Sequence, residues 1–131
     1  MSDVADPTIA STLHPALRAI VDDVPKPSRK LLRCAACDNP ITTEEARIEM
    51  RGGHAHTFTN PYGFRFQVGC FADALGCSIS GEPSHADTWF PRYFWRIAAC
   101  ASCQVHLGWH FENAEARAFF GLILPRLKPA S

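Results

Sequence analysis

Two pairs of cysteines constrain this sequence more than any other feature. Cys34 and Cys37 form one CxxC pair, Cys100 and Cys103 form another, and residues 38 to 99 separate them. Two thiolates at this spacing can wrap one face of a metal ion, and two such knuckles complete a tetrahedral site. Four thiolates suit zinc, whose closed sites of soft ligands are structural. The sequence therefore predicts one structural Zn²⁺ that joins two distant parts of the chain.

A four-cysteine site leaves no position open for water or substrate, so we do not expect the metal to act as a catalyst. The alternatives are a redox-active CxxC or buried free thiols, but two pairs without a thioredoxin-like βαβ pattern do not favour redox chemistry. Cys70 and Cys77 remain outside the set. We interpret them as buried thiols, because the sequence places no base or cation beside either one.

The composition argues against two classes of partner. The chain of 131 residues has 13 basic and 13 acidic side chains and no basic patch, so we expect no nucleic-acid partner. No stretch approaches the roughly 20 apolar residues of a membrane span, and the N-terminus lacks the features of a secretory signal. We expect a cytoplasmic protein, and in that reducing setting six cysteines favour a metal or free thiols over disulfides.

Residues 1–30 differ from the rest of the chain. They contain four prolines and no aromatic residue, and we expect a flexible tail within which HPALRAIVDDVP could form a short helix. Residues 31–131 instead carry the signals of short strands and turns, and we expect them to form a single zinc-stabilised domain.

Alternating apolar residues predict a mostly β domain. The segments FRFQVGCF, YFWRIAA and VHLGWHF alternate, and NPYG at 60–63 predicts a turn. FFGLIL predicts a last strand, with a helix from Ala114 as the alternative. The connections are short, so the strands should be chiefly antiparallel. The residues expected on one face of the first segment are Phe64, Phe66, Val68 and Cys70.

All three tryptophans lie between residues 89 and 109. Trp95 and Trp109 flank the second CxxC pair, and at about 3.3 Å per residue each should lie about 16 to 20 Å from the metal on neighbouring strands. Trp89 reaches the same region from a loop. The three indoles could simply be core, or they could form a pocket for a flat or cationic group. No catalytic triad, paired carboxylates or phosphate loop accompanies them, so the predicted pocket binds rather than reacts.

Several motifs in one order resemble a known family. NPYG, TWFPRYFW, the two CxxC pairs, HLGWHF and FFGLI together resemble the thalidomide-binding (CULT) domain of cereblon, and more closely its small stand-alone bacterial members. The resemblance covers residues 32 to about 127. It implies a β-tent, in which two antiparallel sheets are pinned near one structural zinc.

The resemblance also implies a function, the non-catalytic binding of a cyclic imide of the glutarimide or thalidomide type, or of a uracil-like ring, in an aromatic cage. In eukaryotes this domain belongs to a ubiquitin-ligase receptor, but nothing here resembles the receptor's other domains, so ligase partners are not implied. The matching positions are Asn60 at the rim, the backbone around Asp87 and Trp89 for hydrogen bonds to the imide, Trp89, Trp95 and Trp109 for the walls, and Phe111 for the base.

Two residues depart from the family pattern. Arg92 stands where many members have glycine, which bears on the conformation of its loop. Phe94 is bulkier than the alanine or aspartate expected there, but strand parity directs it away from the cage.

Two other functions compete with this interpretation. One is a zinc-stabilised protein-interaction module in which the tryptophans are core or contact surface. The other is an enzyme, because CASCQVHLGWHF also resembles the HLGHVF segment of methionine sulfoxide reductases; no cysteine follows Cys103 to serve as their nucleophile. Four histidines could suggest a second metal, but we interpret them as structural or solvated: His54, His56, His106 and His110.

The first prediction concerns the tail. A chain that starts at Lys30 should fold and bind cyclic imides as the full chain does, because residues 1–30 contain no aromatic residue and no cysteine. Circular dichroism would test the fold, and quenching of tryptophan fluorescence would test binding. Lost affinity with an intact fold would mean that the tail helps to form the pocket.

Overall fold

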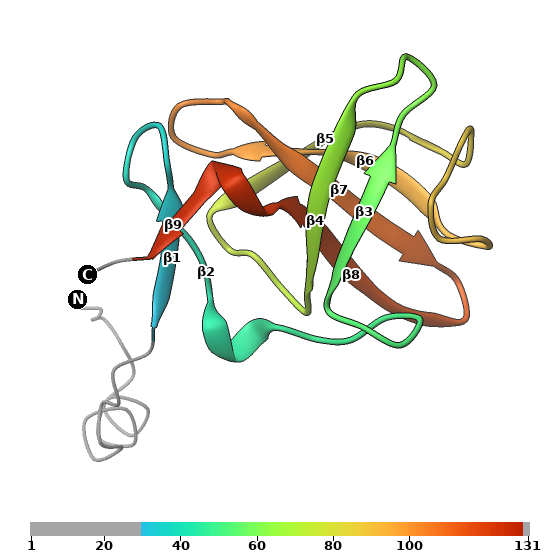
Figure 1. Ribbon diagram of the computed structural model, residues 1–131, viewed down its shortest axis with the longest axis horizontal. Helices are drawn as coiled ribbons and strands as arrows, with labels where there is room; N and C mark the ends of the chain where they lie inside the picture. Colours follow the sequence, from blue (N-terminus) through green and yellow to red (C-terminus); the bar gives the residue numbers. More distant parts are fainter. Residues whose placement is uncertain (1–29, 130–131) are drawn as a thin grey trace.

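The computed structural model describes residues 30–129, which form nine strands in two antiparallel sheets (Figure 1). No α-helix occurs in this range, so the prediction of a mostly β fold with two antiparallel sheets is confirmed. The helix considered in the tail lies outside the described residues. None of the helical segments within 30–129 has the length and apolar character needed to cross a membrane.

The small sheet has the order β2-β1-β9 and brings the two ends of the described chain together (Figure 1). FFGLIL forms the end of β8 and the start of η2, so the prediction of a strand is confirmed and the alternative of a helix from Ala114 is wrong. The prediction that it is the last strand is also wrong, because β9 follows it. The bounds are β1 Leu31–Cys34, β2 Pro40–Thr43 and β9 Leu127–Pro129, with the short 3-10 turns η1 Glu44–Ala46 and η2 Leu124–Arg126.

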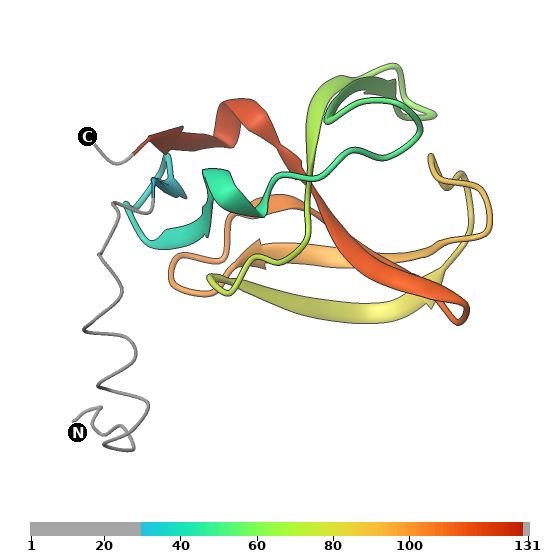
Figure 2. The same ribbon diagram turned by 90° about the horizontal axis from the view of Figure 1, so that it is seen from below.

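The large sheet has the order β3-β4-β8-β7-β6-β5. Its bounds are β3 Ala55–Thr59, β4 Arg65–Phe71, β5 Cys77–Ser84, β6 Phe94–Cys100, β7 His106–Asn113 and β8 Ala116–Ile123. Between β4 and β8 the pairing begins only at Val68, because β8 ends opposite it at Ile123. Residues 65–67 pair only with β3, so the outer half of the β3–β4 hairpin leaves the sheet and rises above the level of β5, β6 and β7 (Figure 2).

A cluster of buried residues lies on each face of the large sheet. One core, which includes Leu32, Phe71 and Leu107, lies between the two sheets. The other, made of Cys70, Phe90, Phe111 and Phe119, lies on the side of the β3–β4 hairpin. Adjacent residues of a strand point to opposite faces, which is why Cys70 and Phe71 of β4 enter different cores.

The predicted faces hold only in part. Val68 and Cys70 are fully buried as expected, but Phe64 precedes β4 and is 65 % exposed, which corrects its assignment to the inner face. The register between β6 and β7 shifts by one residue between Ala98 and Ala99. This extra residue in β7 reverses the parity, so Leu107 joins the core between the sheets whereas Phe111 joins the aromatic one.

Gly76, directly before β5, lies between β2 of the small sheet and the turn that follows β6. Its N–H donates to the Ile41 carbonyl at 3.0 Å, and its own carbonyl accepts from the Ala101 N–H at 2.9 Å. A Cβ at this position would lie 1.9 Å from the Pro40 carbonyl oxygen. Only glycine therefore lets β2 lie against the turn that follows β6.

The second prediction follows from this contact. Gly76→Ala should lower the free energy of unfolding by about 1 to 3 kcal/mol or more, the usual range for an overpacked site, because the methyl group meets backbone on the facing strand. Urea denaturation would measure the loss. Gly53→Ala is the matched control, since its Cβ would meet only one atom, at 3.8 Å, and it should change stability by no more than about 0.5 kcal/mol.

Candidate functional site

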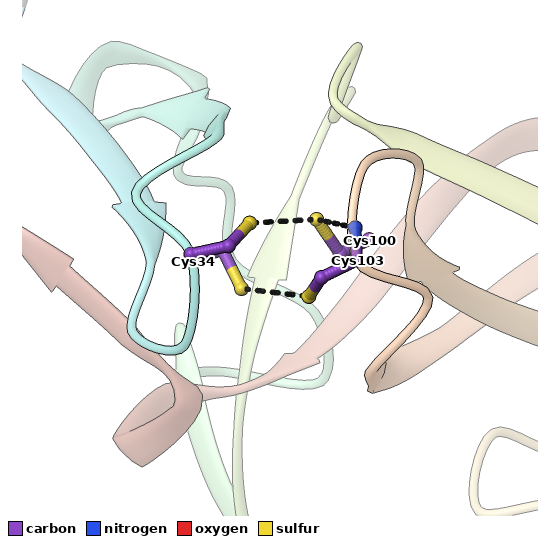
Figure 3. Close-up of side chains that lie close together, drawn as sticks. Cys34, Cys100 and Cys103 are labelled. Atoms are coloured by element: carbon purple, nitrogen blue, oxygen red, sulfur yellow. Dashed lines mark hydrogen bonds between the residues drawn. The ribbon is translucent and has the colours of Figure 1, made fainter.

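The four predicted cysteines form one cluster between the sheets. Their sulfur atoms all lie within 4.8 Å of one another. The Sγ atoms of Cys34 and Cys103 are 3.8 Å apart, and those of Cys37 and Cys100 are 3.6 Å apart (Figure 3). In a tetrahedral zinc site with Zn–S bonds of about 2.3 Å, neighbouring sulfurs are about 3.8 Å apart. The four thiols are therefore arranged to hold one metal ion.

The two knuckles are built alike. Cys34 ends β1 and Cys100 ends β6, and each carbonyl accepts a hydrogen bond from the residue four positions later. These bonds run from the Asp38 N–H at 2.8 Å and from the Gln104 N–H at 2.9 Å. Asp38 and Gln104 both adopt left-handed conformations, with φ of 71° and 68°. The same local turn thus presents two thiols from each sheet.

The surroundings of Cys100 favour a thiolate. Burial acts to raise its pKa, but the N–H groups of Cys103 and Ser102 donate to its sulfur, and the net effect lowers the pKa to about 6. The side-chain amide of Asn39 also donates to this sulfur, at 3.6 Å. These donors orient and stabilise a metal-ligating sulfur.

Cys70 and Cys77 have a different character. Burial raises the pKa of both thiols to about 12. Cys70 is fully buried in the aromatic core, and Cys77 packs at the core between the sheets. Both residues are therefore protonated at neutral pH, in agreement with their interpretation as buried thiols.

A pocket of about 410 Å³ opens at the other end of β6 and β7. Every residue predicted for the ligand site lines it, and three residues that the prediction did not include, Pro61, Tyr62 and Ala86, line it as well. The predicted residues that meet here are Asn60, Asp87, Trp89, Trp95, Trp109 and Phe111.

Trp89 and Trp109 form a corner of this pocket. Their ring centroids are 4.8 Å apart and their planes are nearly perpendicular, at 80°. Trp95 lies on β6 directly opposite Phe111 of β7, while Trp109 pairs with Ile97, nearer the knuckle. Spacing in the sequence predicts that Trp95 and Trp109 lie about equally far from the metal, but the register places them two residues apart along the strands.

Two further aromatic residues support this corner. The ring of Phe58 stacks on Trp89 at 4.6 Å with an interplanar angle of 9°. Phe66 meets Trp109 edge-on at 5.6 Å. Both come from the β3–β4 hairpin where it leaves the sheet. Alternation in the sequence predicts an apolar face for Phe66 but does not connect it with the cage. Alternation in AHTFT could have identified the strand that carries Phe58.

The histidines are engaged in local hydrogen bonds, and none belongs to a metal cluster in the described range. His54 and His56 bond carbonyls of the preceding turn, and His110 bonds Glu112 at 2.9 Å. The Nε2 atom of His106 lies 2.8 Å from the Gly108 carbonyl oxygen, and its ring packs edge-on against Trp109 at 5.0 Å. Burial lowers the pKa of His106, so a neutral imidazole supports the indole.

The rim of the pocket is the predicted NPYG turn. The N–H of Gly63 donates to the Asn60 carbonyl at 2.9 Å, which confirms the turn. The Oδ1 atom of Asn60 accepts hydrogen bonds from the N–H groups of Tyr62 and Phe64, each at 2.9 Å. Asn60 therefore organises the loop at the mouth of the pocket.

The loop between β5 and β6 supplies the remaining wall. Arg92 has a φ of 77°, the left-handed conformation that glycine adopts most easily, and its carbonyl accepts from Asn113 at 3.1 Å. The loop thus keeps a conformation suited to glycine despite the arginine. Phe94 is 44 % exposed and does not line the pocket, in agreement with its predicted direction.

Two backbone groups of this loop are free to meet a ligand. Within residues 30–129, neither the carbonyl of Asp87 nor the N–H of Trp89 has a hydrogen-bond partner. The adjacent Ala86 carbonyl accepts from Trp95 Nε1 at 2.9 Å. One acceptor and one donor, two residues apart in the chain, are therefore left at the pocket wall.

Comparison with known proteins relates the chain to cereblon. It is 33 % identical over 109 residues to cereblon of Gallus gallus, 32 % over 104 residues to that of Xenopus tropicalis and 38 % over 99 residues to that of Drosophila erecta. These matches cover 76 %, 75 % and 70 % of this chain but only 24 %, 23 % and 17 % of the relatives. No model of a protein family matches the chain. The chain thus contains a cereblon-like domain and spans about a quarter or less of these relatives' length.

The third prediction concerns the cysteine cluster. Cys37→Ser should lose the bound metal ion and lower the free energy of unfolding by several kcal/mol, since structural metal sites contribute about 10 kcal/mol or more. Elemental analysis and thermal denaturation would measure both effects. Ala36→Ser is the matched control, because Ala36 is exposed in the same knuckle and offers no ligand. Wild-type protein that folds without metal would contradict the prediction.

Proposed function

Because the chain contains a cereblon-like domain, we propose that it is a non-catalytic binding module for a cyclic imide of the glutarimide or thalidomide type, or for a uracil-like ring. The observation that carries the proposal is a pocket lined by all three tryptophans and by Asp87, with the Asp87 carbonyl and the Trp89 N–H unpaired within residues 30–129. The closer likeness to stand-alone bacterial members, and the expectation that ligase partners are not implied, stay predictions.

The edge of an imide fits these backbone groups. An imide presents acceptor, donor and acceptor along one edge, so its N–H would donate to the Asp87 carbonyl while one of its carbonyls accepts from the Trp89 N–H. The rest of the ring would lie against the indoles of Trp89, Trp95 and Trp109, whose faces favour flat groups. Hydrogen bonds from the backbone to the imide edge would let the pocket select imides, although no set of catalytic side chains lines it.

The size of the pocket suits a small ligand. Its volume of about 410 Å³ lies at the lower end of the roughly 300 to 1,000 Å³ of small-molecule sites. A glutarimide has eight heavy atoms, and at about 1 kcal/mol per atom the dissociation constant would be about micromolar at best. A substituent on the ring would extend through the mouth, past Tyr62.

We propose zinc as the metal of the cysteine cluster. Sulfur separations of 3.6 and 3.8 Å suit tetrahedral Zn–S bonds, and a set of four thiolates favours zinc over harder ions. Bound there, zinc would supply structural stability and no chemistry. Elemental analysis that found another metal, with intact folding, would contradict this assignment.

The reductase alternative has less support. It would need Cys70 or Cys77 as nucleophile, and burial raises the pKa of both to about 12. A thiol with such a pKa is a weak nucleophile at neutral pH. Incubation with a methionine sulfoxide peptide and dithiothreitol would test the alternative, and we expect no reduction.

The fourth prediction tests the cage. Trp109→Ala should weaken glutarimide binding about thirtyfold or more, because it removes one wall and about 2 kcal/mol of contact energy typical of aromatic hot spots. N-methylglutarimide should bind the wild type at least as poorly, since it lacks the donor and leaves the Asp87 carbonyl unpaired. Titration by intrinsic fluorescence or calorimetry would measure both.

Phe94→Ala is the matched control, because it removes an exposed aromatic ring that lies outside the pocket; it should bind glutarimide like the wild type. If Trp109→Ala stays folded and binds normally, the tryptophans are core and the protein-interaction module becomes the better interpretation. If glutarimide and its N-methyl derivative bind equally, recognition through the imide edge is wrong.

A further inference from the structure

The residues that line the pocket all lie within residues 30–129, and Asp87 is the only one of them with a charged side chain. We propose that this carboxylate makes the cage select imides that carry a positive charge beside the ring, such as an ammonium group, over neutral or acidic ones. The inference rests on the proposed function, because it names the class of ligand that the same pocket would take.

The backbone holds Asp87 in place at the pocket wall. On one side, the Ala86 carbonyl accepts from Trp95 Nε1 at 2.9 Å and the Ala86 N–H donates to Ser84 Oγ at 3.1 Å. On the other side, the Thr88 N–H donates to the His85 carbonyl at 3.4 Å. Asp87 itself has a φ of 54°. These bonds fix the backbone on both sides of Asp87, a residue that lines the pocket.

Asp87 takes part in no ion pair in the part of the chain that the structure describes. Within residues 30–129 no basic side chain lies within ion-pair distance of its carboxylate. The basic groups nearby in the fold have other partners: Arg51 donates to the Trp89 carbonyl at 3.4 Å, and Arg96 pairs with Glu112 at 3.6 Å. The carboxylate of Asp87 is therefore left without an ion-pair partner among these residues.

The indoles favour the same sign of charge. The face of an aromatic ring attracts cations, most strongly in tryptophan, and three indoles line the space next to Asp87. A cation on the ligand would thus meet an attractive carboxylate and attractive ring faces, whereas a carboxylate on the ligand would be repelled by both. The indole faces and the Asp87 carboxylate would both attract a cationic substituent on the ring, and neither attraction involves the imide edge.

A left-handed conformation alone could also account for an aspartate at this position, since aspartate and asparagine tolerate it better than most residues. This alternative supplies the test variant. Asp87→Asn keeps the size of the side chain and its tolerance of φ near +54°, and it removes only the charge.

The experiment compares 3-aminoglutarimide with 3-hydroxyglutarimide at pH 5.5, below the usual pKa of an α-amino group. The two ligands have the same number of heavy atoms, and only the first is cationic. Calorimetry on the wild type should give the tighter dissociation constant for the ammonium ligand. Asp87→Asn should reduce that preference, the ratio of the two dissociation constants, about two- to fivefold, the effect of an exposed ion pair.

A salt titration on the wild type tests the same inference without a variant. Raising the ionic strength from 0.02 M to about 1 M should reduce the preference for the ammonium ligand, because the Debye length falls to about 3 Å. A preference that is equal in wild type and Asp87→Asn, or insensitive to salt, would overturn the inference.

Unsubstituted glutarimide separates this failure from failure of the proposed function. If glutarimide binds the wild type but the ammonium group brings no preference, the imide cage stands and the charge selection is wrong. If Asp87→Asn weakens all three ligands equally, Asp87 acts through its backbone and the inference is again wrong. If glutarimide does not bind the wild type, the proposed function fails, and the inference fails with it.

Discussion

The fold depends on the junction at which four thiols hold two sheets together. β1 and β6 end at this junction, and each contributes one knuckle. The small sheet has only three strands, of 4, 4 and 3 residues. Its position therefore depends on the core between the sheets and on the cysteine cluster. Gly76 lies at the same place and permits the close contact of β2. A metal ion bound by the four thiols would therefore stabilise the same junction as this backbone packing.

The same strands that leave the junction build the pocket at their far ends. β6 and β7 run from the second knuckle to Trp95, Trp109 and Phe111. A metal ion in the cysteine cluster would fix one end of this pair, and the aromatic core fixes the other. The hairpin β3–β4 leaves the sheet where β8 ends and brings Phe58 and Phe66 behind the tryptophans. Trp89 and Trp109 are thus held by packing on their outer sides, and their other surfaces line an open pocket.

Most of the site could be predicted because its residue types are rare and closely spaced. Four cysteines in two CxxC pairs predicted the cluster, and the tryptophans, with the family resemblance, predicted the residues that line the pocket. What could not be predicted depends on contacts between distant segments. The extra residue in β7 that reverses the parity at Leu107, the departure of Phe58 with its hairpin, and the last strand β9 follow from pairing partners that periodicity does not specify. The exposure of Phe64 has a local cause, since Asn60 holds it in the turn.

A division of tasks between backbone and side chains follows from this arrangement. Any residue could supply the carbonyl of position 87, and any residue except proline the N–H of position 89, provided that the loop keeps its left-handed turns at Asp87 and Arg92. The imide edge would then be recognised by conformation rather than by side-chain identity. The side chain at position 87 is free to vary without disturbing that edge, within the residue types that tolerate a positive φ. A site of this kind can keep its ring specificity while the charge at its mouth adapts to the substituent that the ring carries.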